Sequence, residues 1–256
     1  MIVTTAQKPS VSLYMHARQL TAELGGRLVE RRQESLNGLK RRYNDNCLLV
    51  VDERGLRYYN DSEEPLYFHP SMAYVRVKRL RKGERDPLID LSGCVPGDRI
   101  IDCTAGLGSD AIVFSYAAGP AGHVTALESE PILCTVVREG LQTYVTDHED
   151  VNDALRRIEM KCMGHKQWLQ EQPDKSVDIV YFDPMFRQPI HDSAALQPLR
   201  GLANKEALDA ESIAHAVRIA RKSVVLKEHR DSGEFGRLGF ERRHVNKIAY
   251  GVITLT

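Results

Sequence analysis

The spacing of hydrophobic and polar residues changes about one third of the way along the chain. Up to residue 90, short runs rich in Val, Leu and Tyr predict strands at 2–5, 27–30, 47–51 and 56–59. The apolar positions of 12–24 recur at helical spacing, and Gly25-Gly26 ends that segment. A second helix is expected over 72–82, with Ser71 as its N-cap. Residues 1–90 are therefore predicted to form a small mixed α/β lobe.

From residue 98 onward, strand-like and helix-like segments alternate. Helices are expected over 110–118, 130–144 and 205–222, and strands over 99–102, 124–128, 158–160, 176–183 and 223–227, with a closing pair at 237–243 and 245–254. The segment 176–183 is almost continuously apolar, as a buried parallel strand should be. The alternation predicts a doubly wound α/β sheet over residues 91–256, which binds ligands beyond the carboxyl ends of its strands.

Composition excludes several classes of protein. A hydrophobic fraction of 42% with 27% charged residues is typical of a globular chain and excludes a mostly disordered or collagen-like one. No apolar run reaches 18 residues, and the first ten residues hold no signal peptide, so a cytoplasmic location without a membrane span is expected.

The cysteines point to no special chemistry. No pair has the C-x-x-C spacing, so neither a zinc site nor a redox dithiol is predicted, and no metal is expected. In a reducing compartment each is interpreted as a small buried hydrophobic residue. These residues are Cys47, Cys94, Cys103, Cys134 and Cys162.

The net charge of zero hides an uneven distribution. Residues 1–90 hold 16 Lys and Arg against 12 Asp and Glu, and the remainder holds 19 against 23. The basic excess is concentrated in a cluster of Lys and Arg at 76–85. A cluster of this kind attracts phosphate, although a solvated helix face is the plainer interpretation. Arg187, His191, Lys205 and Lys227 are further candidates for phosphate contacts. The cluster that we predict to contact RNA consists of Arg76, Lys78, Arg79, Arg81 and Lys82, next to Arg85.

A glycine-rich turn joins the first strand and first helix of the second unit. Its sequence is Asp102-Cys-Thr-Ala-Gly-Leu-Gly-Ser-Asp-Ala111, in which Gly106, Gly108 and Ala111 match a dinucleotide-binding fingerprint. Glu128 ends the next strand, where it could accept hydrogen bonds from ribose hydroxyls. An NAD-dependent oxidoreductase is therefore one possible function, although the sequence places no base for hydride transfer.

The charges around this turn favour a different cofactor. Asp102 and Asp110 would repel a pyrophosphate by roughly 1–4 kcal/mol for each close pair of charges, whereas a sulfonium and an ammonium would be attracted. We therefore expect S-adenosylmethionine, with Gly164 and His165 beside its adenine. The plainer alternatives are that Asp110 only begins a helix and that Glu128 is a solvated acid.

The segment Asp183-Pro184-Met185-Phe186 follows the most apolar strand. An exocyclic amine of a base is a poor nucleophile because its lone pair is delocalised into the ring. Ionised Asp183 could accept its N–H, Pro184 would restrict the loop, and Phe186 could stack on the base. These three residues are the predicted catalytic set. An Asp-Pro turn followed by a core Phe is the alternative.

Residues 100–256 resemble the bacterial small-subunit ribosomal RNA guanine-N2 methyltransferases of the RsmJ type. The resemblance rests on the Gly-rich turn and on 127–131, 180–186 and 220–227. It implies a class I methyltransferase fold, which is Rossmann-like, and methylation of guanine N2 in 16S ribosomal RNA. It also implies cofactor contacts at Ser109, Asp110, Glu128, Ser129, Gly164, His165 and Asp183.

Two departures from the family bear on substrate recognition. Arg187-Gln188-Pro189 follows the tetrapeptide where relatives tend to have Pro and basic residues, and the first ~90 residues match poorly. Cofactor use is therefore expected to carry over better than the target nucleotide. Methylation of another RNA or of a small molecule, and a non-catalytic RNA-binding or ribosome-assembly module, stay open, and the oligomeric state is not specified.

Overall fold

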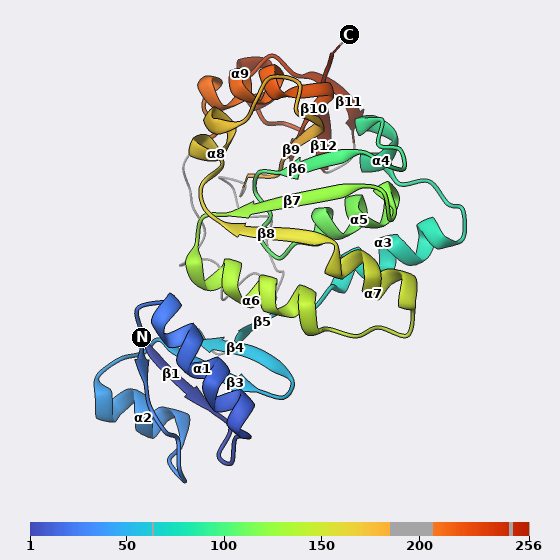
Figure 1. Ribbon diagram of the computed structural model, residues 1–256. Helices are drawn as coiled ribbons and strands as arrows, with labels where there is room; N and C mark the ends of the chain where they lie inside the picture. The colour runs from blue at the N-terminus through green and yellow to red at the C-terminus, as the bar shows by residue number, and fades with distance from the viewer. Residues whose placement is uncertain (63, 185–206, 246–247, 256) are drawn as a thin grey trace.

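The computed structural model describes residues 1–62, 64–184, 207–245 and 248–255, and it contains two sheets (Figure 1). The N-terminal sheet has five strands in the order β2-β1-β3-β4-β5. Strands β2, β1 and β3 are parallel, whereas β3, β4 and β5 are antiparallel. Their bounds are β1 (Ile2–Thr5), β2 (Arg27–Leu28), β3 (Leu48–Asp52), β4 (Gly55–Tyr59) and β5 (Leu66–Tyr67).

Both faces of this small sheet are covered by helices. Alternate residues of β1 and β3 point to opposite faces, so both strands can be buried almost completely. Ile2 and Leu48 pack with Leu39 of α2 (Leu36–Tyr43), a helix that was not predicted. Val3 and Leu49 pack with residues of α1 (Val11–Glu23) in a second hydrophobic cluster. This cluster continues into the larger part of the protein.

The second sheet has seven strands in the order β11-β12-β10-β9-β6-β7-β8. The five strands from β10 to β8 are parallel, and β12 pairs antiparallel with both β10 and β11. The strand order reverses beside β6, which is the position where doubly wound sheets bind ligands. The bounds are β6 (Arg99–Asp102), β7 (His123–Glu128), β8 (Ile158–Cys162), β9 (Val177–Phe182), β10 (Ala220–His229), β11 (Glu241–Val245) and β12 (Ile248–Thr254).

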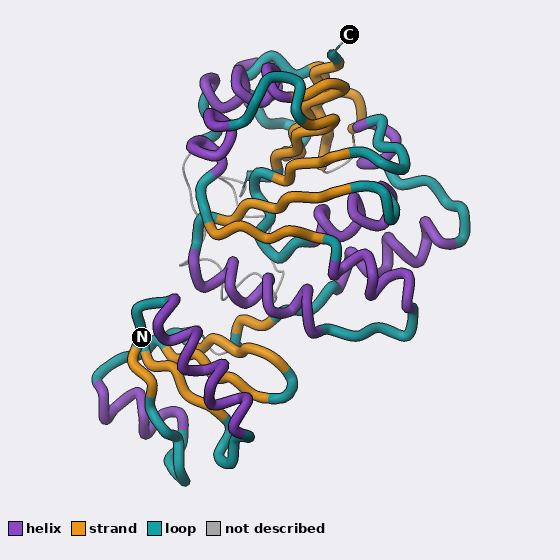
Figure 2. Tube along the Cα trace, in the orientation of Figure 1, coloured by secondary structure: helices purple, strands orange, loops and turns teal. Residues whose placement is uncertain are grey.

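Helices pack on the two faces of this sheet, as the tube view also shows (Figure 2). Ile100, Ile179 and Tyr181 face the cluster that contains α5 and α6, whereas Ile101 and Phe182 face the cluster of α8 and α9. The predicted doubly wound α/β fold is confirmed. The bounds are α5 (Ser109–Ala118), α6 (Pro131–Thr143), α7 (Glu149–Arg156), α8 (His165–Glu171), α9 (Ala210–Ile219) and α10 (Glu234–Arg237).

The N-terminal lobe contacts the larger unit mainly at α6. A Cβ placed on Gly140 would lie only 2.1 Å from Phe68, so this glycine is what allows the lobe to pack closely. Glu23 of α1 also receives two hydrogen bonds from Arg138, at 2.6 and 2.9 Å. Helices α3 (Ser71–Arg81) and α4 (Pro87–Ser92) already pack against α5 and β10. The packing partners therefore change near residue 70, before the expected division at residue 90.

Other local predictions differ in detail. Pro70 occupies the N-cap position of α3, and Ser71 is its first helical residue. Within the described residues the last long helix begins at Ala210, because the Asp209 side chain caps it by accepting from the Ser212 N–H at 2.6 Å. Helices α2, α4, α7, α8 and α10 were not predicted, and the strand expected at 237–243 is instead β11, which begins at Glu241. None of the helices in the described ranges has the length and apolar character needed to cross a bilayer.

Candidate active site

The turn between β6 and α5 is built by one buried carboxylate and two glycines. Asp102 Oδ1 accepts the N–H of Thr104 at 3.1 Å, which closes an Asx turn. Gly106 and Gly108 have φ of +51° and +76°, the left-handed region that favours glycine. Asp102 is only 1% exposed, and its burial raises its pKa well above the ordinary value. The Asp102 side chain therefore stabilises the turn from the protein interior and does not face a ligand.

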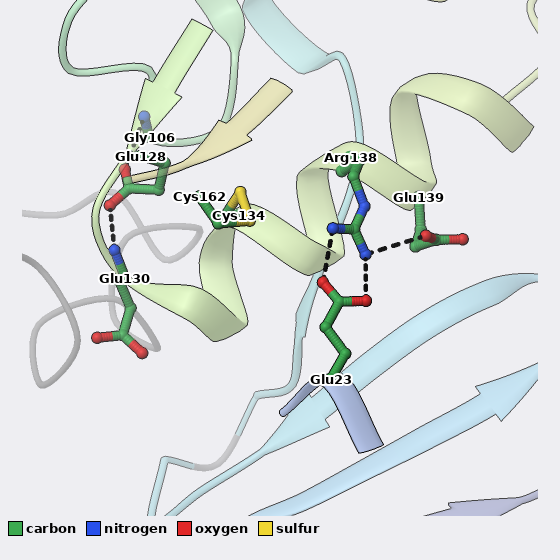
Figure 3. Close-up of a disulfide and its surroundings, with 8 residues drawn as sticks. All are labelled: Glu23, Gly106, Glu128, Glu130, Cys134, Arg138, Glu139 and Cys162. Carbon is green, nitrogen blue, oxygen red and sulfur yellow. Dashed lines mark hydrogen bonds and ion pairs between the residues drawn. A yellow bond between two sulfur atoms is a disulfide. The ribbon is translucent and has the colours of Figure 1, made fainter. Parts of the chain in front are cut away.

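Glu128 closes the other side of this turn (Figure 3). Its carboxylate accepts the N–H of Gly106 at 3.1 Å and the N–H of Glu130 at 2.9 Å. Burial raises its pKa, while these backbone donors act to lower it. Each oxygen still has lone-pair capacity, so the fixed carboxylate can accept a pair of neighbouring hydroxyl groups.

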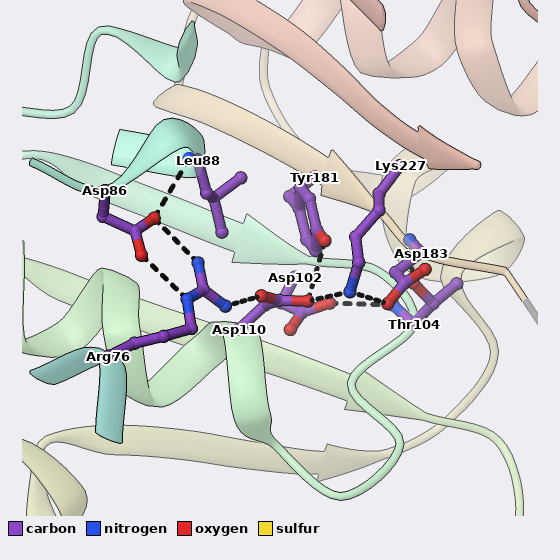
Figure 4. Close-up of polar contacts among 9 residues, drawn as sticks. All are labelled: Arg76, Asp86, Leu88, Asp102, Thr104, Asp110, Tyr181, Asp183 and Lys227. Atoms are coloured by element: carbon purple, nitrogen blue, oxygen red, sulfur yellow. Dashed lines mark hydrogen bonds and ion pairs between the residues drawn. The ribbon is translucent and has the colours of Figure 1, made fainter. Parts of the chain in front are cut away.

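Asp110 lies at the centre of a buried network of charges (Figure 4). Its Oδ1 receives the Arg76 guanidinium at 2.5 Å, and its Oδ2 receives the Tyr181 hydroxyl at 2.8 Å and the Lys227 ammonium at 2.9 Å. Burial opposes its charge, but Lys227 and Arg76 outweigh that effect and lower the pKa of Asp110. The side chain is 6% exposed.

Asp183 follows β9 at the same edge of the sheet. Its backbone N–H donates to the Thr104 hydroxyl at 2.6 Å, and its Oδ2 accepts from Lys227 at 2.6 Å. Burial raises the pKa of Asp183 to about 6, and the charge of Lys227 limits that rise. The side chain is 25% exposed, so it is accessible in a way that Asp102 and Asp110 are not.

Arg76 reaches this network from α3, outside the sheet. It binds both oxygens of Asp86 at 2.8 Å in addition to its contact with Asp110. Burial opposes its charge, but Asp86 and Asp110 together raise its pKa. The carboxylates of Asp86, Asp110 and Asp183 thus share two cations, Arg76 and Lys227.

Comparison with known proteins identifies the family. A family described as "Putative SAM-dependent methyltransferase" matches residues 33–235. The chain belongs to this methyltransferase family. It is 39% identical to the uncharacterized protein YpiP of Bacillus subtilis (strain 168), over 98% of both chains. It is also 27% identical to ribosomal RNA small subunit methyltransferase J of Acinetobacter baumannii (strain AYE), over 72% of this chain and 62% of that protein.

A solved structure shows the same fold. The SAM-dependent methyltransferase structure from Neisseria gonorrhoeae matches with a TM-score of 0.64 and 15% identity, covering 99% of this chain and 96% of that one. Together with the family, this establishes a class I methyltransferase fold and S-adenosylmethionine as the cofactor, rather than NAD. The chain spans less than two thirds of the length of the methyltransferase J relatives.

The residues of the methyltransferase turn fit this cofactor for one of the two reasons that the sequence suggested. Glu128 holds its carboxylate beside the positive-φ glycines, where its oxygens could accept ribose hydroxyls, and that contact stays a prediction. The expected attraction by Asp102 and Asp110 needs correction, because Asp102 is buried under the turn and both oxygens of Asp110 are taken by side chains of the protein. Only a residual negative charge is left, since three carboxylates pair with two cations and burial raises the pKa of Asp102.

The other predicted cofactor residues lie at the same edge of the methyltransferase sheet. Ser109 begins α5 and Ser129 follows β7. Gly164 is the N-cap of α8, and the ring of His165 contacts Phe182 edge-on, with centroids 5.6 Å apart. Their contact with the cofactor stays a prediction. Pro184 is half-buried beside Asp183, whereas Met185, Phe186, Arg187, His191 and Lys205 lie outside the described residues.

The basic cluster divides into an inward and an outward part. Arg76 was expected to meet RNA, but it points inward to Asp86 and Asp110 and is 20% exposed. Lys227 was expected to contact phosphate, and it is likewise occupied by Asp110 and Asp183. Four residues of α3 and its C-cap stay on the surface, where Arg79 pairs with Glu84 and Arg81 with Asp150. These four are Lys78, Arg79, Arg81 and Lys82.

Two cysteines correct the prediction that all five are buried, unpaired residues. Cys134 of α6 and Cys162 at the end of β8 form a disulfide (Figure 3). Cys162 is opposite Glu128 in the β7–β8 register, so the bond lies beside Glu128. A separation of 28 residues gave no sequence signal, because only the packing of α6 on β8 brings the sulfurs together. Cys47 is only partly buried.

Reduction of this disulfide is expected to lower the free energy of unfolding by about 3–4 kcal/mol, because the bond closes a loop in the unfolded chain. Urea unfolding with and without reductant measures the effect, and exposed Cys162 gives the reductant access. The double variant Cys134→Ala/Cys162→Ala is the control and should not respond to reductant. Equal stability of the wild type in both conditions would show that the bond does not contribute.

Sequence reasoning missed Tyr181, Thr104 and the true roles of Arg76 and Lys227. Lys227 ends a predicted strand, as do Asp102 and Asp183, so the sequence already indicated that the three side chains lie at one edge of the sheet. Arg76 carried no such signal, because α3 meets α5 only in the folded protein.

Proposed function

We propose that this methyltransferase transfers a methyl group to an exocyclic amine of RNA, namely the N2 amine of a guanine in 16S ribosomal RNA. The observation that carries the proposal is the position of Asp183. Among the carboxylates of Asp86, Asp102, Asp110 and Asp183, that of Asp183 alone is not buried, and its backbone N–H donates to Thr104 of the β6–α5 turn.

The chemistry needs an acceptor at this point. When bound, the cofactor would supply an electrophilic methyl group on a sulfonium sulfur, which is the leaving group for attack by the amine nitrogen. Ionised Asp183 accepts an N–H of the amine and so directs the nitrogen lone pair toward the methyl group. The nitrogen loses one proton in the transfer, and Asp183 is placed to receive it. Pro184 limits the motion of the backbone beside it.

Two observations support RNA as the acceptor. Several relatives that match this chain carry the name ribosomal RNA small subunit methyltransferase J. In addition, the exposed cations of α3 and its C-cap form a face that can meet phosphates. Lys78 and Lys82 are one helical turn apart on that face. We propose cytoplasmic ribosomal RNA, in a small subunit, as the substrate.

Mapping of methylated nucleosides tests the proposal. Ribosomal RNA from cells lacking this protein is expected to lose one N2-methylguanine, and the purified wild-type protein with labelled cofactor should restore it. RNA from cells that hold the protein serves as control and should accept no label. Incorporation into another RNA or a small molecule would replace the proposed substrate. Binding of ribosomal RNA without any incorporation would favour a non-catalytic assembly module.

A further inference from the structure

Lys227 occupies a position that the proposed chemistry has not yet used. It is near the C-terminal end of β10, next to β9 in the sheet, and its side chain is 18% exposed. Its ammonium lies between two carboxylates, 2.9 Å from Asp110 Oδ2 and 2.6 Å from Asp183 Oδ2. Asp110 is itself fixed by Arg76 and Tyr181 (Figure 4). The Lys227 ammonium thus connects the buried carboxylate of Asp110, which other residues hold in place, to the partly exposed carboxylate of Asp183.

We propose that Lys227 is the positioning residue of the acceptor site: it holds Oδ2 of Asp183 and leaves Oδ1 to receive the N–H of the substrate amine. The inference rests on the proposed function and deepens it. Lys227 does not touch the reacting atoms, because its role is to orient Asp183 and keep it ionised. A protonated Asp183 would lose part of its acceptor capacity and could not take the amine proton.

The surroundings of Asp183 show why a cation is needed there. Asp110 on α5, Asp102 on β6 and Glu228 on β10 are acids whose charges disfavour ionisation of Asp183. Tyr181 on β9 and Tyr250 on β12 also face this network. Arg76 on α3 is bonded to Asp86 and Asp110, so Lys227 is the cation bonded directly to Asp183 among the described residues. Without it, burial and three acids would all favour the protonated form.

The same strand supplies a matched control. Lys222, near the start of β10, pairs with buried Asp98 at 2.6 Å, at the opposite end of the strand from Asp183. Lys222→Met therefore removes a lysine–aspartate pair of similar geometry from the same strand. It is expected to affect stability but neither the titration of Asp183 nor the pH dependence of methyl transfer.

The first experiment measures Asp183 directly. The protein is labelled with ¹³C at the aspartate carboxyl carbons, and the Asp183 signal is assigned as the one missing from Asp183→Asn. Lys227→Met should raise the pKa of Asp183 by about 1 to 3, the usual effect of losing an adjacent opposite charge. Lys227→Gln, which keeps a hydrogen-bond donor without charge, should do the same, and Lys222→Met should not. An unchanged pKa in the Met and Gln variants would overturn the proposal.

The second experiment measures the pH profile of kcat and KM. Since Asp183 must be ionised, wild-type kcat should fall as the pH drops below about 6. Lys227→Met should move this fall in kcat to higher pH, so that kcat at pH 6 is about 5- to 500-fold below wild type and recovers toward pH 9, while KM changes less. Lys227→Arg should restore the wild-type dependence of kcat on pH. A uniform loss at every pH would indicate a merely structural role and reject the inference.

The two experiments separate this inference from the proposed function. The carboxyl titration needs neither cofactor nor RNA. A wild-type protein that methylates no RNA would reject the proposed function, whatever the titration gives. A wild-type protein that is active, with the same Asp183 pKa and pH profile in Lys227→Met, would reject the inference alone.

Discussion

Replacement of Asp183 by Ala is expected to reduce kcat for methyl transfer by roughly 10²- to 10⁴-fold, the range for loss of one well-placed acceptor or proton-transfer group. Cofactor affinity should change much less, because Glu128 and the glycine turn do not depend on the Asp183 side chain. Isothermal titration with the demethylated cofactor product and single-turnover kinetics measure the two quantities separately. Thr104 still receives the backbone N–H of residue 183, so the turn should be preserved.

Asp178 provides the control for this variant. It lies near the start of the same strand, β9, where it accepts hydrogen bonds from Arg221 and from the backbone N–H of Arg99. Asp178→Asn removes a paired aspartate from the opposite end of β9 and should leave kcat within about twofold of wild type, because Asp178 contacts none of the described residues of the site. Full transfer by Asp183→Ala would reject the role assigned to its carboxylate.

Replacement of Asp110 by Ala is expected to cost about 3–5 kcal/mol of unfolding free energy, because it leaves the buried cations Arg76 and Lys227 without a shared partner. The effect is on folding rather than on direct cofactor contact, since both oxygens of Asp110 bond to the protein. Urea unfolding at pH 7 measures it. A loss of cofactor affinity with unchanged stability would instead support direct contact.

Asp150 makes the comparison with a surface pair possible. It too accepts from an arginine of α3, Arg81, and from a tyrosine, Tyr116, but its side chain is 45% exposed. Asp150→Ala should cost less than about 1 kcal/mol, because water solvates the groups left behind. A similar cost for Asp110→Ala would mean that burial does not strengthen the network.

The pH dependence of stability provides a second test of the ion pairs made by Asp110. The pKa of Asp110 is lowered in the folded protein, so its contribution is fully present above its unfolded pKa of about 4 and is lost as the pH falls below that value. The wild type should therefore lose stability toward pH 2 more steeply than Asp110→Ala. Parallel curves for the two proteins would contradict the assigned ion pairs.

The sequence determined the alternation of strands and helices, the glycine turn, and the place of Glu128 and Asp183 at strand ends. Periodicity and turn chemistry are local properties, and parallel strands align their carboxyl ends at one edge, so these features follow from neighbouring residues. The identity of the cofactor was predicted correctly, although the two acids that suggested it are occupied by the protein itself.

Tertiary structure alone decided which charges reach one another. Arg76 and Asp110 are 34 residues apart, and Lys227 and Asp110 are 117 apart, yet they share one buried cluster. The pairing of Cys134 with Cys162 and the packing of Phe68 on Gly140 depend equally on how α6 lies against its neighbours. The physical reason is that charge pairing and close packing depend on distance in space and on exclusion of water, neither of which is encoded in residue spacing along the chain.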